Sequence, residues 1–316
     1  MFKRKFWLSG LFGSLVIPCP AQDVPGSNMV NMVLVPAGPF TMGSDLTDQS
    51  AVAKDFGLKK PLYMDEHPKH TVTLPAYWID KFEVTNAEYL RFVIATNGWV
   101  PVTWEQTGYL LAPHLLAKAD SELLRRIAIE TFKIESNVED LDKDALISTI
   151  NSKRQSMDPL PVTGVTWKNA NDYCHWLGKR LPTEAQWEKA ARGVDQREYP
   201  WGVNWDETKL NAGGGEKWEY GVAPVGSYPA GESPFKAHDL AGNVMEWVHD
   251  WYAPYPGSNY QSENFGKRFR VARGGGWGGT GHYAVSHFYR NGFRFFLDPE
   301  AAFSDLGFRC VASEQG

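Results

Sequence analysis

Hydrophobic residues between positions 164 and 193 recur with the spacing of two short helices. Gly178 and Pro182 separate the two segments; glycine commonly ends a helix in a left-handed conformation, and proline cannot continue one. Thr166 can cap the first helix, and Thr183 with Gln186 has the spacing of a capping box at the start of the second. One apolar face of the first helix, at i, i+3, i+4 and i+7, consists of Ala170, Tyr173, Cys174 and Leu177. The pattern by itself is typical of a helical corner buried in a core.

Alternating apolar and polar residues predict β-strands in the first part of the chain. Residues 32–42 alternate around 36–38, which predicts a strand, a turn and a second strand. Residues 70–74 alternate as a half-buried strand does, and residues 77–82 form another predicted strand. Thr85 then stands where it can cap a helix.

Residues 104–158 are expected to form a helical insert. Aliphatic residues between 115 and 132 have helical spacing, the stretch 135–144 is acidic, and residues 145–150 can add a further turn or two. This pattern suits a surface insert that only packs, and it also suits a lid or a partner-docking element. Both interpretations stay open at the level of sequence.

The first 21 residues have the pattern of a secretory signal. Three basic residues begin at Lys3, and the apolar run 6–17 is too short to span a bilayer. Cleavage after Ala21 would release a periplasmic or secreted protein with no transmembrane segment. Cys19 offers an alternative, a lipid-anchored protein, although Pro18 before it fits such a site poorly. The basic start and the prolines argue against a buried N-terminal strand.

Composition excludes some classes of partner. The chain has 316 residues, 43% of them hydrophobic, and a net charge of −5, which gives no electrostatic footprint for nucleic acid. Thirty glycines and 13 tryptophans indicate many turns and close aromatic packing. Cleavage after Ala21 would leave two of the three cysteines, Cys174 and Cys310, in a compartment where disulfides persist.

Eight motifs follow one another in an order that resembles one known family. They are MVLVPAGPFTMGSD (32–45), DEHPKHTVTLPAYWIDKFEVTNAEYLRFV (65–93), the helical corner (164–193), YPWG (199–202), APVGSYPAG (223–231), DLAGNVMEW (239–247), VARGGGWGG (271–279) and LGFRC (306–310). The family is that of the formylglycine-generating enzymes, also called the sulfatase-modifying-factor domain. One such motif alone would be a weak signal, and eight in order are a specific one.

The resemblance implies a fold and a disulfide. The expected fold is α+β and related to C-type lectin domains, with small twisted antiparallel sheets, few helices and many loops, over residues 30–313. In the family, the cysteine of the first corner helix bonds the cysteine that follows GFR. The resemblance therefore implies a Cys174–Cys310 disulfide, with two separate buried thiols as the alternative.

The resemblance also implies structural calcium bound by side-chain and backbone oxygens. One site would use side chains of Asp239 and Glu246 with the carbonyls of Gly242 and Val244. A second site would begin at Asn211 and Ala212, with Glu216 or Glu219 as its carboxylate. The alternative for the first site is a loop that an Asx turn stabilises without metal.

The copper chemistry of the family cannot be assembled in its usual way. Active members hold copper(I) between two cysteines, because soft thiolates suit that ion. Those positions correspond to Gly281 and Ser286, and there is no cysteine between residues 175 and 309. Iron-linked relatives add a domain with three histidines, whereas the insert here carries only His114. Neither copper nor iron is therefore expected.

Polar residues occupy the corresponding stretch and are the candidates for catalysis. They are His282, Tyr283, Ser286, His287 and Arg290. Two histidines five residues apart could bind a metal ion or perform acid–base chemistry. The alternative is a polar surface loop in which Arg290 and Arg294 make structural hydrogen bonds.

Two classes of function remain open. The first is an exported factor that modifies or matures a protein or a metabolite, with oxidoreductase chemistry among its candidate reactions. The second is a non-catalytic, calcium-stabilised protein that binds a ligand or a partner. In either class, the partner would be an exported protein or a small molecule, and the sequence does not identify it.

Overall fold

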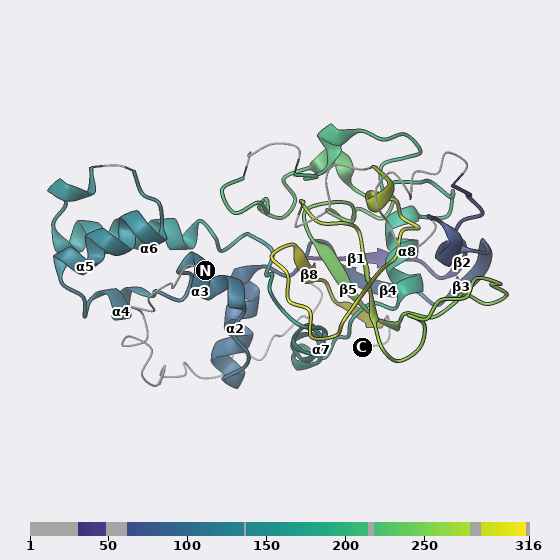
Figure 1. Cartoon of the computed structure of the whole chain (residues 1–316), viewed down its shortest axis with the longest axis horizontal. Helices are drawn as coiled ribbons and strands as arrows, with labels where there is room; N and C mark the ends of the chain where they lie inside the picture. Colours follow the sequence, from purple (N-terminus) through teal and green to yellow (C-terminus); the bar gives the residue numbers. More distant parts are fainter. Residues whose placement is uncertain (1–30, 49–61, 136, 214–217, 279–285, 314–316) are drawn as a thin grey trace. The chain divides into compact units, whose positions relative to one another are not determined.

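The computed structural model describes residues 31–48, 62–135, 137–213, 218–278 and 286–313 (Figure 1). The predicted signal segment, His282 and Tyr283 lie outside these residues. Contacts divide the chain into two compact units. One contains Leu90–Asp158, and the other contains Ser27–Tyr89 and Pro159–Gly316.

Three small sheets form the larger unit. The first has the order β1 (Met32–Val35), β4 (Tyr77–Asp80), β9 (Val311–Ser313), and the second pairs β2 (Gly38–Met42) with β3 (His70–Leu74). The third has the order β7 (Phe295–Leu297), β6 (Arg270–Arg273), β5 (Met245–Trp251), β8 (Leu306–Phe308). Pairing is antiparallel except between β5 and β8. These short mixed sheets confirm the predicted α+β class.

The strands predicted early in the chain are confirmed, with one change of length. The two strands of residues 32–42 join different sheets, since Val35 pairs with Tyr77 of β4 and Gly38 pairs with Leu74 of β3. Strand β4 ends at Asp80, two residues before the predicted end. The backbone N–H of Lys81 still donates to the carbonyl of Asn31 at 2.7 Å, so the pairing with β1 continues for one residue beyond the end of β4.

The helical corner is confirmed as α7 (Trp167–Trp176) and α8 (Glu184–Arg192). Thr183 and Gln186 form the predicted capping box, and Thr166 forms a second box with Asn169. Gly178 follows α7 with a φ of 69°, the left-handed conformation that glycine adopts without strain. Local sequence therefore determines where both helices begin and where the first one ends.

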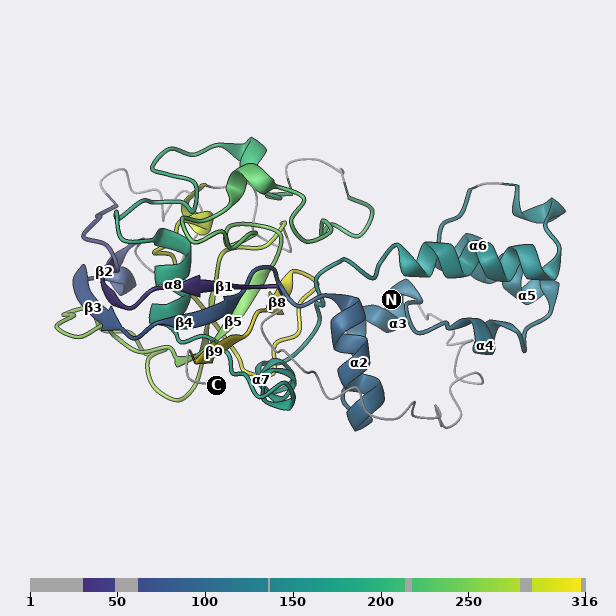
Figure 2. The same ribbon diagram turned by 180° about the vertical axis from the view of Figure 1, so that it is seen from behind.

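Helices α7 and α8 pack on the sheets of the larger unit (Figures 1 and 2). Helix α8 contacts β2 and β5, and α7 contacts β5. Trp187 of α8 is fully buried in a core with Tyr77 and Ile79 of β4 and Val248 of β5. The core therefore joins the first sheet, the third sheet and the corner.

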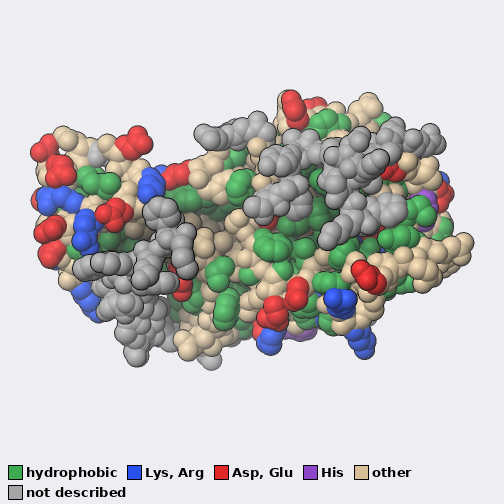
Figure 3. All heavy atoms as spheres, in the orientation of Figure 1, with side chains coloured by type: hydrophobic (Ala, Val, Ile, Leu, Met, Phe, Trp, Pro, Cys, Tyr) green, Lys and Arg blue, Asp and Glu red, His purple; other side chains and the backbone are tan. Residues whose placement is uncertain are grey.

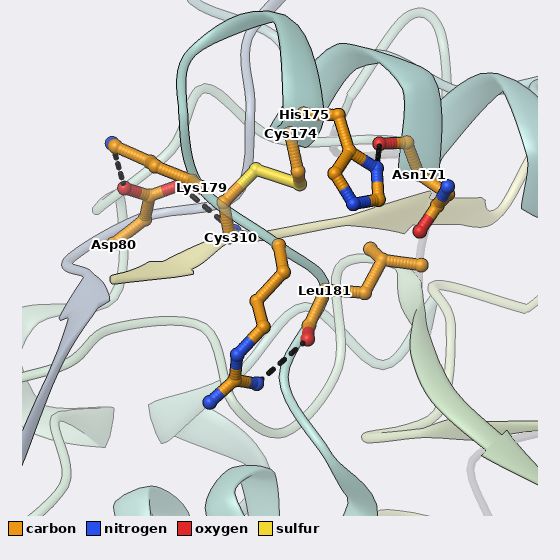
Figure 4. The surroundings of a disulfide bond; sticks show 8 residues. Asp80, Asn171, Cys174, His175, Lys179, Leu181 and Cys310 are labelled. Atoms are coloured by element: carbon orange, nitrogen blue, oxygen red, sulfur yellow. Dashed lines mark hydrogen bonds and ion pairs between the residues drawn. A yellow bond between two sulfur atoms is a disulfide. The ribbon is translucent and has the colours of Figure 1, made fainter. Parts of the chain in front are cut away.

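The Cys174–Cys310 disulfide that the resemblance implied is present (Figure 4). It links residues 136 positions apart, and both cysteines are fully buried. Asp80 lies beside it, accepting a hydrogen bond from the backbone N–H of Cys310 at 2.8 Å and from Lys179 Nζ at 2.8 Å. The bond therefore fixes the end of α7 to the C-terminal strand region.

The smaller unit is helical. Helix α2 (Asn86–Thr96) leads into it, and its other helices are α3 (Val102–Thr107), α4 (Pro113–Leu116), α5 (Ser121–Arg126), the π-helix η2 (Ile127–Thr131), the 3-10 turn η3 (Val138–Asp140) and α6 (Lys143–Gln155). The helical spacing of aliphatic residues between 115 and 132 gave no sign that the helix is interrupted there. The helix restarts because the Asp120 side chain accepts from the backbone N–H of Leu123 and caps α5.

The surface of the smaller unit carries both signs of charge. Figure 3 shows acidic and basic side chains interspersed over α4, α5 and α6, as expected of a solvated helical surface. No helix within the described residues is long and apolar enough to cross a membrane.

Candidate functional site

Arg290 lies at the centre of a buried ion-pair network. Its Nη1 and Nη2 donate to the two carboxylate oxygens of Glu66 at 3.0 and 2.6 Å, and its Nε donates to Glu198 at 3.0 Å. The guanidinium also lies 4.5 Å from the ring centroid of Tyr63. Glu66 belongs to the short 3-10 helix η1 (Met64–Glu66). Arg290 therefore ties this early segment to the C-terminal stretch, as the structural interpretation of this arginine requires.

Two further arginines, Arg294 of the same stretch and Arg273 of β6, bind acidic side chains of helix α8. Arg294 Nε and Nη2 donate to Glu184 at 2.7 and 2.9 Å. Arg273 Nη1 donates to Glu184 at 3.0 Å, and its Nη2 donates to Glu188 at 2.6 Å. Burial opposes ionisation of Glu188, but Arg192 and Arg273 lower the pKa of its carboxyl. The network holds charges that the protein interior would otherwise exclude.

Ser286 and His287 begin the 3-10 helix η6 (Ser286–Tyr289). Burial, and then the positive charge of Arg290, lower the pKa of His287, so its imidazole is neutral at pH 7. The ring centroid of His287 lies 5.9 Å from that of Tyr63. The Tyr199 hydroxyl donates to the Ser286 carbonyl at 3.4 Å. The structure thus brings together Ser286, His287 and Arg290 of the predicted site.

An aromatic cluster adjoins this turn and was not singled out from the sequence. The rings of Tyr199 and Trp201 stack at 5.2 Å with an interplanar angle of 7°, and those of Trp205 and Tyr289 stack at 5.5 Å. Both tryptophans are partly exposed. The signal available in the sequence was the run of three aromatic residues at 199, 201 and 205. The cluster provides flat apolar surface beside Ser286.

Asp239 is the best-placed residue of the proposed calcium ligands. It has a φ of 57°, and its Oδ2 accepts from the backbone N–H of Gly226 at 2.6 Å. Burial raises the pKa of the Asp239 carboxyl to about 6. A hydrogen bond with the Glu83 side chain lowers the pKa of Asp239 in part, and a buried carboxylate of this kind is a group that a bound cation can stabilise.

Glu246 fits a calcium ion less well than Asp239 does. Arg309 Nη2 and Nε donate to its two oxygens, both at 2.7 Å, and Trp187 Nε1 donates to it at 2.8 Å. Burial opposes the charge of Arg309, while Glu246 raises the pKa of its guanidinium. Three donors therefore already occupy the Glu246 carboxylate.

Glu83 is an acidic residue beside Asp239 that sequence reasoning missed. It is almost fully buried, and its oxygens accept from Asn243 Nδ2 at 3.2 and 3.4 Å. Burial, and then the negative charge of Asp239, raise its pKa well above the ordinary value. The available signal was an acidic residue directly after a predicted strand.

The remaining predicted calcium residues meet at one loop junction. The backbone N–H of Asn243 donates to the Asn211 carbonyl at 2.8 Å, and Asn211 Nδ2 donates to Asn243 Oδ1 at 3.1 Å. Gly242 has a φ of 79°, and the carbonyl of Ala212 accepts from the Tyr289 hydroxyl at 3.4 Å. Val244 is fully buried next to this turn. Within the described residues, no cluster of three or more His, Cys, Asp or Glu side chains could hold a metal ion, so calcium there would depend on carbonyl oxygens.

The sheets, the disulfide-linked corner and the buried arginine network define an α+β domain of the formylglycine-generating-enzyme-like class. The structure of PvdO from Pseudomonas aeruginosa has this fold, with a TM-score of 0.56, 24% identity and coverage of 89% of this chain and 94% of that one. A sequence model of the "Sulfatase-modifying factor enzyme 1-like domain" matches residues 20–314. The chain belongs to this family.

Relatives within the family differ in what their names state. The chain is 29% identical over 344 residues to the mouse "Inactive C-alpha-formylglycine-generating enzyme 2", covering 98% of this chain and 97% of the relative. It is 32% identical over 285 residues to "Hercynine oxygenase" of Mycolicibacterium smegmatis, covering 83% of this chain and 57% of the relative. Membership in the family therefore does not by itself select one reaction.

Proposed function

We propose that the chain is an exported maturation factor that modifies a protein or a metabolite without copper–thiolate chemistry. One observation carries the proposal: the cysteines that follow Ala21, Cys174 and Cys310, form a buried disulfide with each other. No thiolate is then left in the mature chain to bind copper(I). The secretory pattern of residues 1–21 supports export, and a mature protein that retained these residues would contradict export by cleavage.

The turn at Ser286 and His287 supplies the acid–base chemistry of the proposal. A neutral imidazole can accept a proton at pH 7, and the lowered pKa of His287 favours that form. Arg290 acts as a positioning residue, because its ion pairs with Glu66 and Glu198 hold the turn in place. The aromatic cluster of Tyr199, Trp201, Trp205 and Tyr289 would bind apolar parts of the substrate.

A calcium-stabilised binding protein without catalysis is the second candidate. The observation that favours it is that Arg290 already forms ion pairs with two carboxylates of the protein, Glu66 and Glu198. Its guanidinium is therefore engaged in structural contacts. Partly exposed stacked rings beside it suit recognition of a partner. The relative named as inactive is compatible with the same interpretation.

Metal content is the measurement that separates these candidates from a metal-dependent oxidoreductase. The mature protein is purified from an exported fraction without chelators and analysed by elemental mass spectrometry. We expect calcium at one or two per chain and no stoichiometric copper or iron. Copper or iron near one per chain that is lost when His282 and His287 are replaced would contradict the proposal and place a redox centre in this stretch.

Replacing both Ser286 and His287 with alanine is expected to abolish activity without unfolding the protein. Activity is measured as a change in the mass of an exported protein or metabolite. This mass change must be lost when the gene is deleted and must return when the wild-type chain is expressed. Because neither side chain anchors the core, the melting temperature should stay within about 2 °C. His114→Ala, an exposed substitution in the smaller unit, is the control and should restore the mass change fully.

Two outcomes of that experiment would count against the catalytic proposal. If the double variant restores the mass change, the site assignment is wrong. If no gene-dependent mass change exists and the double variant only loses affinity for a partner, the binding protein is the correct class.

Calcium should stabilise the chain through Asp239. At about one hundred times its dissociation constant, a ligand of the folded state adds about 2.7 kcal/mol to the free energy of unfolding. We expect chelator to lower the melting temperature of the wild type, and Asp239→Ala to have a low melting temperature that chelator does not change. Asp239→Asn keeps a side-chain oxygen and should keep most of the effect. Equal melting temperatures of the wild type with calcium and with chelator would disprove the site.

A further inference from the structure

A cavity in the larger unit is separate from the turn at Ser286 and His287. It has a volume of about 230 Å³ and lies between the segment that follows β4, the start of α2 and the end of α7. Its polar wall includes Asp80, Glu88 and Lys179, and its apolar wall includes Phe82, Tyr173 and Val225. No residue of the proposed catalytic turn lines it.

The charges of the polar wall do not cancel. Lys179 Nζ lies 2.8 Å from Asp80 Oδ1, and the other oxygen of Asp80 accepts from the backbone N–H of Cys310. This pair is therefore neutral as a whole. Glu88, by contrast, forms no ion pair with any of the residues that the structure describes.

The Glu88 carboxylate is held in place by the helix that it caps. Its Oε2 accepts from both the backbone N–H and the hydroxyl of Thr85, each at 2.9 Å. These bonds use one of the two carboxylate oxygens, which leaves Oε1 as an acceptor for a ligand. Glu83 also lines the cavity, but both of its carboxyl oxygens already accept from Asn243 Nδ2.

We propose that this cavity binds a small primary amine. The ammonium group would pair with Glu88, and the apolar part of the ligand would pack against Phe82 and Tyr173. A metal ion is a poorer match, because it requires several oxygen ligands and the oxygens of Asp80 are already occupied by two donors. The cavity is smaller than the roughly 300–1,000 Å³ of sites for drug-sized ligands, so the amine must be small. This proposal does not depend on the proposed function.

Calorimetric titration of the full mature chain with 2-phenylethylamine tests the proposal. The neutral analogue 2-phenylethanol has the same ring and chain length, and calcium is held constant in all titrations. We expect the amine to bind at least about tenfold more tightly than the alcohol, because a charged hydrogen bond to Glu88 is present only with the amine. Equal affinities, or no saturation by the amine, would overturn the proposal.

Glu88→Gln is the decisive variant. Glutamine caps α8 at the equivalent position next to Thr183, so the substitution should leave the helix folded and remove only the charge. We expect about a tenfold loss of amine affinity and no change for the alcohol, with Glu122→Gln in the smaller unit as a matched control. Val225→Phe should reduce the space in the cavity and weaken both ligands. Unchanged amine affinity in either cavity variant would show that the amine binds elsewhere.

Discussion

Arg309→Ala is expected to lower the free energy of unfolding by about 3–5 kcal/mol, since it leaves a buried charge without its partner. Glu246 is fully buried, and Arg309 supplies two of its three side-chain donors. Arg309 Nη2 also donates to the carbonyl of His238 at 2.8 Å, and its Nη1 donates to that of Asp80 at 3.1 Å. The loss therefore includes unsatisfied backbone acceptors as well as the carboxylate. Denaturant unfolding followed by tryptophan fluorescence measures it.

A second substitution identifies the origin of that loss. Glu246→Gln in the Arg309→Ala background removes the unpaired charge and should recover part of the stability. The exposed i,i+4 pair of Lys168 and Asp172 provides the control, because Lys168→Ala should cost less than about 1 kcal/mol. Equal losses for Arg309→Ala and Lys168→Ala would mean that the buried pair contributes no more than a surface one.

Removing the disulfide with Cys174→Ala and Cys310→Ala is expected to cost about 2–5 kcal/mol. The bond joins residues 136 positions apart, and a cross-link over a long segment removes much of the freedom of the unfolded chain. The midpoint of denaturant unfolding should fall accordingly. A double variant as stable as the wild type would mean that packing alone holds α7 against the C-terminal strands.

The burial of the disulfide gives a further control on that experiment. Both cysteines are inaccessible to solvent, so a reductant should leave the bond intact in the native protein and cleave it only after denaturant is added. Mass spectrometry after alkylation distinguishes the two states. Rapid reduction of the native protein would indicate local opening near Cys310.

Local signals predicted the elements well, because helix caps and strand alternation depend on neighbouring residues. Thr85, Thr166 and Thr183 each cap the helix that the sequence assigned to them. The interruption near Asp120 was missed because the aliphatic spacing on either side is itself helical. The disulfide followed from the resemblance, since two cysteines alone do not show that they meet.

The candidate site was predicted only in part, because its decisive contacts connect distant segments. Glu66 and Arg290 are 224 residues apart, and Glu83 and Asn243 are 160 apart. No pattern along the chain relates such distant residues. The ion pairs of Arg290 and the position of Glu83 beside Asp239 are therefore found only in the three-dimensional structure. The roles of His282 and Tyr283 stay predictions, as they lie outside the described residues.

Strands β8 and β9, which lie close together in the sequence, complete two different sheets. Residues 306–313 supply a partner to β5 in one sheet and to β4 in another, together with Arg309 and Cys310. Two sheets of the larger unit are therefore complete only when residues 306–313 are in place. A chain truncated before residue 306 lacks the strands that pair with β5 and with β4, so we expect neither of these two sheets to be completed in it.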